Sequence, residues 1–149
     1  MCADVLEHLQ PAADSAGVHM ILEGEAHWIN GARQIADEMV YNLCDNAIKY
    51  NRPGGTVWVR LEARDAETVA LSVEDTGIGI PEEHQSRVFE RFYRVDKNRS
   101  REIGGTGLGL SIVKHGALYH GAALYLNSAP GVGTKITVVF PKQGPDPES

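Results

Sequence analysis

The 149-residue sequence contains only two cysteines, Cys2 and Cys44, and few aromatic side chains. Two cysteines this far apart give neither a metal-ligand spacing nor a disulfide framework, so we expect a reducing environment. No segment has the length and apolar character of a membrane-spanning helix, and none resembles a secretory signal. Aliphatic residues therefore have to fill the core of what we expect to be one domain.

Positive charge is also scarce. The sequence has 14 Lys and Arg residues and 20 Asp and Glu residues, which gives a net charge of -6. This balance argues against general nucleic-acid binding and against an anionic membrane surface as the main partner. One basic island interrupts the acidic chain between residues 91 and 101. It consists of Arg91, Arg94, Lys97, Arg99 and Arg101, with the single acid Asp96. Charge alone leaves two explanations open, a local anionic ligand and a solvated loop.

Apolar periodicity predicts alternating helices and strands. Helices are expected at residues 4–16, 32–50 and 107–120, and strands at residues 18–22, 26–29, 56–62, 68–74, 123–127 and 135–140. Asn30-Gly31 and Pro53-Gly54 are turn signals. Because short turns join most neighbouring strands, we expect an α+β fold. It would be a two-layer sandwich with a mixed, mostly antiparallel sheet and helices on one face. Residues 1–142 would form the domain and residues 143–149 a disordered tail.

The predicted helix at 32–50 carries a broad apolar arc and, opposite it, a narrow polar stripe. The arc comprises Ala36, Met39, Val40, Leu43, Cys44, Ala47 and Ile48. On the stripe, Asn42, Asn46 and Lys49 follow one another at helical spacing after Glu38. An amide oxygen suits Mg²⁺ and an ammonium suits phosphate, although a solvated helix face also explains the stripe.

Two glycine-rich segments follow. In Asp75-Thr-Gly77-Ile-Gly79, alternate glycines after a strand allow a flat ligand to approach, and the carboxylate can accept a hydrogen bond from an exocyclic amine. The run from Gly104 to Gly109 precedes a predicted helix, whose free N–H groups favour phosphate. Leu110 stands where a Rossmann fingerprint needs glycine, and the chain has no Gly-Lys pair for a P-loop. Each segment alone could be an ordinary turn or hinge.

In this order and spacing, the motifs resemble the catalytic domains of histidine kinases. That family belongs to a superfamily that includes gyrase, MutL and a heat-shock chaperone. Asn42-Leu-Cys-Asp-Asn46-Ala-Ile-Lys-Tyr50 resembles the N box, Asp75–Gly79 the first glycine box, Phe89-Glu-Arg-Phe-Tyr-Arg94 the F box, Gly105–Leu110 the second glycine box and Gly131-Val-Gly-Thr134 the final glycine turn. The pattern is most similar to the membrane-bound, phosphate-sensor type of kinase, and it implies a Bergerat-type ATP-binding fold.

The resemblance implies ATP and Mg²⁺ as cofactors, with Asn46 as the metal ligand. It implies that Asp75 bonds the adenine N6 amine and that Tyr50 lies along the base, while residues from about 81 to 106 form a lid over the nucleotide. The full set of implied ATP contacts is Asn42, Asn46, Lys49, Tyr50, Asp75, Gly77, Gly79, Ile80, Tyr93, Arg94, Gly105, Thr106, Gly107, Leu108, Gly109, Leu110 and Thr134.

Two departures bear on catalysis. Hydrolytic members of the superfamily place a glutamate four residues before the metal asparagine, where this chain has Asn42, so we expect slow ATP hydrolysis. Kinases of the family carry a phosphoacceptor His followed by an acid on separate dimerisation helices. None of the six histidines here is followed by Asp or Glu. We therefore expect no self-phosphorylation, and we expect both the acceptor and the base on those helices.

The resemblance implies two partners, the protein's own dimerisation helices and a response regulator. It also implies that the chain is the cytoplasmic catalytic portion of a membrane-anchored sensor, and we expect the isolated domain to be a monomer. Three other functions remain open: a serine kinase that binds sigma factors, a non-catalytic nucleotide-sensing module and a gyrase-like hydrolase. The long lid argues against the first, the full set of nucleotide contacts against the second, and Asn42 against the third.

Overall fold

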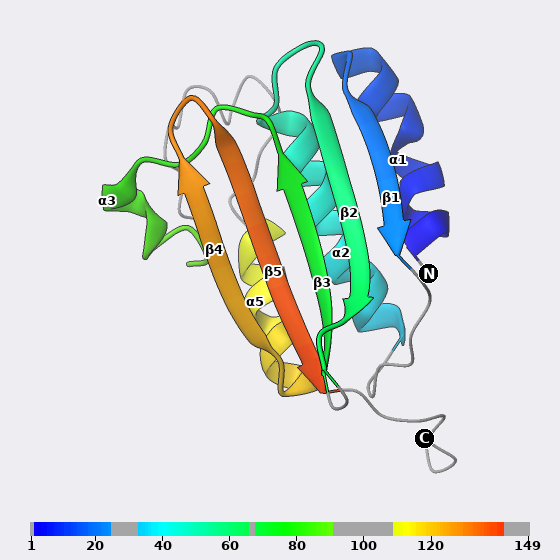
Figure 1. Ribbon diagram of the computed structural model, residues 1–149, viewed down its shortest axis with the longest axis vertical. Coiled ribbons are helices and arrows are strands. Elements are labelled where there is room, and N and C mark those ends of the chain that lie inside the picture. The colour runs from blue at the N-terminus through cyan, green and yellow to red at the C-terminus, as the bar shows by residue number, and fades with distance from the viewer. Residues whose placement is uncertain (1, 25–32, 66–67, 91–108, 142–149) are drawn as a thin grey trace.

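The computed structural model describes residues 2–24, 33–65, 68–90 and 109–141, which form one sheet covered by helices on one face (Figure 1). The strands are β1 (His19–Gly24), β2 (Thr56–Ala63), β3 (Thr68–Asp75), β4 (Ala123–Ala129) and β5 (Gly133–Pro141). The helices are α1 (Cys2–Ala16), α2 (Arg33–Lys49), the short α3 (Glu82–Gln85) and α5 (Gly109–His120). This arrangement confirms the expected α+β sandwich.

The sheet has the strand order β1-β2-β3-β5-β4. β1 pairs with β2 in parallel, and every other neighbouring pair is antiparallel. The parallel pair requires a crossover between β1 and β2, and α2 lies in that crossover. β3 has β2 on one side and β5 on the other, so the end of β3 is supported by strands on both sides.

The core lies between the sheet and the helices. Alternate residues of β2, β3 and β5 face the helices, because side chains alternate along a strand. These residues are Val57, Val59, Leu61, Val69, Leu71, Val73, Ile136, Val138 and Phe140. On α2, the buried residues are Met39, Val40, Leu43, Cys44, Ala47 and Ile48. The apolar arc predicted for this helix is thus confirmed, apart from Ala36, whose side chain lies outside the described part.

Several element boundaries differ from the expectation by one or two residues. β1 starts at His19, because the N–H of Val18 bonds to the carbonyl of Ala13 and still belongs to the end of α1. β5 starts at Gly133, because this residue pairs with Ala129 across the hairpin. The short helix α3 was not expected; it follows Pro81 and begins with two acidic residues, a favourable start for a helix.

Some expectations fall on residues outside the described part. These are the strand at 26–29 with its Asn30-Gly31 turn, most of the lid, and the tail at 143–149. Among the helices that the structure does describe, none has the length and apolarity needed to cross a membrane.

Replacing Leu71 with Ala tests this core. Leu71 is 1% exposed in the central strand β3, so its loss should lower the free energy of unfolding by about 2–5 kcal/mol. The matched control is Leu118→Ala on α5, where the side chain is 68% exposed and the expected change is within about 0.5 kcal/mol. Urea unfolding followed by circular dichroism measures both, and equal effects would contradict the assigned core.

Candidate functional site

Asp75 is the centre of the candidate site. It ends β3, and its side chain continues the alternation of the buried Val69 and Val73, so it points to the helix side of the sheet. The carboxylate oxygen Oδ1 accepts two backbone hydrogen bonds, from the N–H of Gly77 at 2.8 Å and from the N–H of Thr134 at 3.2 Å. One oxygen atom thereby joins the end of β3, the turn that follows it and the start of β5.

Burial raises the pKa of Asp75 to about 6, from an ordinary value of 3.8. Removal from water disfavours the charged carboxylate, and the two N–H bonds from Gly77 and Thr134 offset only part of this effect. The neighbouring charge of Glu74 raises the pKa slightly further. A carboxylate with this perturbed pKa, held in a fixed position, is typical of a functional site.

The first glycine turn packs tightly against the protein's own backbone. A Cβ at Gly77 would overlap the carbonyl oxygen of Tyr50, and a Cβ at Gly79 would overlap the carbonyl oxygen of Ala129. Gly79 also has a φ of 74°, which favours glycine. Both glycines are therefore required by packing. The room they were expected to leave for a base stays a prediction.

Backbone hydrogen bonds connect this turn to two other segments. The N–H of Ile78 donates to the carbonyl of Tyr50 at 3.1 Å, which attaches the turn to the end of α2. The N–H of Gly131 donates to the carbonyl of Ile78 at 2.8 Å, which attaches it to the β4–β5 turn. Three segments far apart in the sequence therefore meet around Asp75.

Sequence reasoning missed Ser128 and Gln85, two side chains that support the site. The Ser128 hydroxyl accepts the N–H of Ile80 at 2.8 Å and lies 2.8 Å from the hydroxyl of Thr134. The Gln85 amide donates to the carbonyls of Ile80 and Ser128, at 2.9 and 3.1 Å. Ile80 and Thr134, both expected as ATP contacts, are thus brought together by polar side chains that no sequence motif marks.

Two further residues missed from the sequence, Asn51 and Arg52, follow α2 directly. Asn51 is buried, and its amide oxygen accepts the backbone N–H of Arg52 at 2.8 Å and the hydroxyl of Thr76 at 3.3 Å. The guanidinium of Arg52 donates to the carbonyls of Gly77 and Gly131. An asparagine just after a predicted helix was the available signal for Asn51, because asparagine is typical of turns.

The polar stripe of α2 is confirmed as a face that stays out of the core. Asn42 and Asn46 are half-buried, and the Asn42 amide donates to the carbonyl of Glu38 at 2.7 Å. A Cβ at Gly109 would lie 3.4 Å from the Asn42 amide oxygen, so Asn42 lies beside the first residue of α5. Lys49 forms an ion pair with Asp45 at 3.0 Å. The N box and the second glycine box thus meet at Asn42.

The remaining expected contacts divide into two groups. Leu110 is partly buried and packs against the core. The others lie outside the described residues, so the structure does not place them. They are Tyr93, Arg94, Gly105, Thr106, Gly107 and Leu108.

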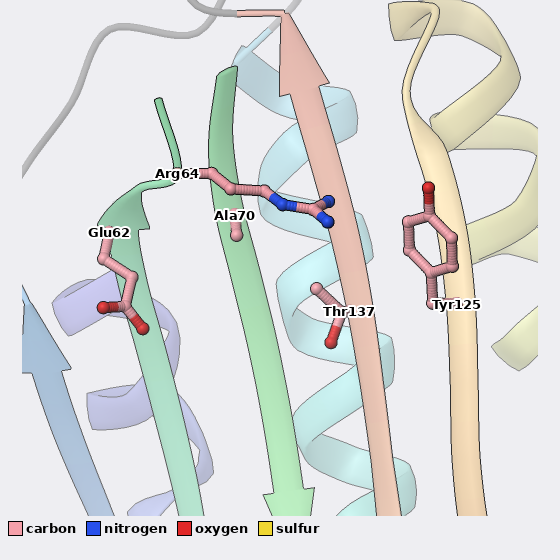
Figure 2. A pocket seen from close by; sticks show the side chains of 5 residues that line it. All are labelled: Glu62, Arg64, Ala70, Tyr125 and Thr137. Atoms are coloured by element: carbon pink, nitrogen blue, oxygen red, sulfur yellow. The ribbon is translucent and has the colours of Figure 1, made fainter. Parts of the chain in front are cut away.

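A shallow hollow on the other face of the sheet is separate from this site. Figure 2 shows it between Glu62, Arg64, Ala70, Tyr125 and Thr137, with the helices behind the strands. The guanidinium of Arg64 lies 5.9 Å from the centre of the Tyr125 ring. Ala70 is near the start of β3 whereas Asp75 is at its end, so the hollow shares no lining residue with the Asp75 cluster.

Comparison with known proteins agrees with the geometry. Residues 31–144 match the family described as histidine kinase-, DNA gyrase B-, and HSP90-like ATPase. The sensor-like histidine kinase SenX3 of Mycolicibacterium smegmatis is 43% identical over 143 residues, which cover 93% of this chain and 36% of that protein. The phosphate regulon sensor protein PhoR of Pseudomonas aeruginosa is 48% identical over 99 residues, covering 66% of this chain and 22% of that protein.

A solved structure is also similar. The mycobacterial sensor histidine kinase MprB superposes with a TM-score of 0.85 at 34% identity, covering 95% of this chain and 93% of that chain. The chain therefore spans about a third of the length of SenX3, while its fold matches a structure of nearly its own size.

Replacing Asp75 with Asn tests the electrostatics of the site. The folded-state pKa is raised from 3.8 to about 6, so the carboxyl stabilises the fold below pH 3.8 and this contribution is lost as the pH rises through 6. Asparagine has no such titration and can still accept both N–H bonds. Between pH 4 and pH 8, the stability of Asp75→Asn relative to the wild type should rise by up to about 3 kcal/mol.

Urea unfolding of both proteins across this pH range measures the difference. Glu62→Gln is the matched control, because Glu62 is exposed on the open face of the sheet. A stability difference between Asp75→Asn and the wild type that stays constant with pH would contradict the raised pKa.

Proposed function

Because the chain belongs to the family of histidine kinase-, DNA gyrase B- and HSP90-like ATPases, we propose that it is the catalytic domain of a sensor histidine kinase. It would bind ATP with Mg²⁺ and supply the γ-phosphoryl group to a histidine on a separate dimerisation domain. The observation that carries this proposal is the fixed Asp75 carboxylate between two glycine turns.

Asp75 is suited to reading adenine. Among the described residues, both hydrogen bonds to its carboxylate fall on Oδ1. The second oxygen, Oδ2, is then the acceptor for the N6 amine of the base. An oxo group, as in guanine, would face this oxygen with a second acceptor and would be rejected. The proposal requires Asn46 and Asp75 to face the same cavity.

The phosphates would lie toward the polar stripe of α2 and the start of α5. Asn42 and Gly109 already lie together there, and the N-terminal N–H groups of α5 favour negative charge. Lys49 would exchange its ion pair with Asp45 for a phosphate oxygen. Arg94 and the glycines from Gly105 to Gly109 would complete the contacts.

The donor set fits a metal that arrives with the nucleotide. The described residues contain no group of three His, Cys, Asp or Glu side chains that could hold a metal ion. Mg²⁺ needs few protein ligands when phosphate oxygens and water complete its shell, so the amide oxygen of Asn46 would suffice. When bound, the metal would offset the charge of the phosphates.

The proposed phosphoryl acceptor lies outside this chain. Asn42 is an amide where hydrolytic relatives need a general base, so water would not be activated efficiently. Catalysis would rest on holding the nucleotide and neutralising its charge while the dimerisation helices present the histidine. We further propose a response regulator as the next acceptor and membrane anchoring of the whole sensor. The named relatives are sensor kinases, which favours this function over the serine-kinase and sensing-module alternatives.

Titration with ATP, with and without Mg²⁺, tests the nucleotide site. In Asp75→Asn, Oδ1 remains bonded to the two N–H groups, so the new NH₂ group takes the place of Oδ2. This group and the N6 amine of adenine are both hydrogen-bond donors and cannot bond to each other. ATP affinity should fall roughly 10- to 100-fold. In Asn46→Ala, the enhancement of binding by Mg²⁺ should fall by about tenfold.

Glu62→Gln and Asn127→Ala serve as matched controls, since both side chains are exposed on the open face of the sheet. Calorimetry gives the dissociation constants. Wild-type affinity in folded Asp75→Asn would exclude the proposed adenine contact.

Incubation with γ-labelled ATP tests whether the phosphoacceptor histidine lies outside this chain. The chain alone should acquire no phosphohistidine and should hydrolyse ATP slowly, because it lacks both a His-acid pair and a base at position 42. Adding a dimerisation domain from a related kinase should produce acid-labile phosphohistidine on that domain only. Labelling of a histidine in this chain, or rapid turnover of ATP, would refute the assignment.

A further inference from the structure

We propose that Arg52 is a positioning residue, which holds the adenine-reading turn in place without contacting the nucleotide. The inference rests on the proposed function, because it concerns the same site. It starts from one guanidinium nitrogen, Nη2, which donates to the carbonyl of Gly77 at 2.8 Å and to the carbonyl of Gly131 at 3.1 Å. These two carbonyls belong to different glycine turns, so one side chain connects both.

The backbone of Arg52 is itself fixed. Its N–H donates to the amide oxygen of the buried Asn51 at 2.8 Å, and its carbonyl accepts the N–H of Gly55 at 2.9 Å. The guanidinium therefore extends from a fixed turn at the end of α2. Because the backbone of Arg52 is held at both its N–H and its carbonyl, the side chain starts from a defined position relative to the two glycine turns.

Arg52 and Asp75 hold Gly77 from opposite ends of the residue. The Asp75 carboxylate accepts the N–H of Gly77, and the Arg52 guanidinium donates to its carbonyl. The Gly131 carbonyl that Arg52 also holds belongs to the β4–β5 turn, a few residues before Thr134, the second donor to Asp75. The same guanidinium thus holds Gly77 directly and also holds the turn that leads to Thr134.

The directions of these bonds separate positioning from phosphate binding. Arg52 points its Nη2 at two backbone carbonyls of the adenine side of the site. Asn42 and Gly109 lie together at the start of α5, on the proposed phosphate side. A residue that acts through Asp75 affects every adenine nucleotide equally. A residue that contacts phosphate affects ATP more than ADP, and ADP more than AMP.

The test compares Arg52→Ala with the wild type in binding to ATP, ADP and AMP. We expect affinity for all three to fall by the same factor, roughly five- to tenfold. Arg52→Lys should recover part of the loss, because the ammonium keeps a charged donor but not the planar group of arginine. Arg64→Ala is the matched control, since it removes one exposed arginine on the other face of the sheet.

The outcomes are distinct. Unchanged affinity in folded Arg52→Ala, or a loss that grows with the number of phosphates, would overturn the positioning role. Should Arg52→Ala fail to fold, the same three-nucleotide comparison is made with Arg52→Lys: a uniform loss supports the role, and no loss or a phosphate-dependent loss overturns it. Absence of ATP binding by the wild type would instead refute the proposed function itself.

Discussion

The hydrogen bonds that converge on one carboxylate oxygen of Asp75 determine how this site is built. They bring together the N–H groups of Gly77 and Thr134, which belong to a turn and to a strand 57 positions further along the chain. Neither segment could hold the other by local structure alone. The surrounding bonds of Ile80, Ser128 and Gln85 add to the same junction. The polar contacts at the end of β3 therefore define a rigid half of the site.

That rigidity has an electrostatic cost. Burial raises the pKa of Asp75 to about 6, so keeping this carboxylate charged at neutral pH lowers the stability of the fold. Its two N–H bonds reduce the cost without removing it. A ligand that donates a hydrogen bond to the second carboxylate oxygen would reduce this cost further. Part of the binding free energy would then come from compensating the desolvation of the Asp75 carboxylate. Burial of this carboxylate therefore lowers the stability of the fold, while it keeps the hydrogen-bond acceptor in a fixed position.

The parts of the molecule that sequence could predict are those with a local signal. The apolar arc of α2 and the alternation in β2 and β3 identify the core, and the motifs containing Asn42 and Asp75 identify the family. The bonds of Arg52 and Ser128 carry no such signal. Arg52 bonds to Gly131, a residue 79 positions away. In the sequence alone, an arginine that bonds to such a distant carbonyl looks the same as an arginine whose side chain contacts only water. The tertiary structure had to supply this partner.

The core and the proposed nucleotide site are connected through α2. Its buried face, from Met39 to Ile48, packs on the sheet, and its opposite stripe carries Asn42 and Asn46. Each residue advances the helix by about 100°, so a shift of one position would turn Asn42 away from the first residue of α5. The last turn of the same helix ends at the Tyr50 carbonyl, which bonds to Ile78. Apolar packing on one side of α2 thus sets the direction in which its amides face on the other, where Asn42 lies beside the first residue of α5.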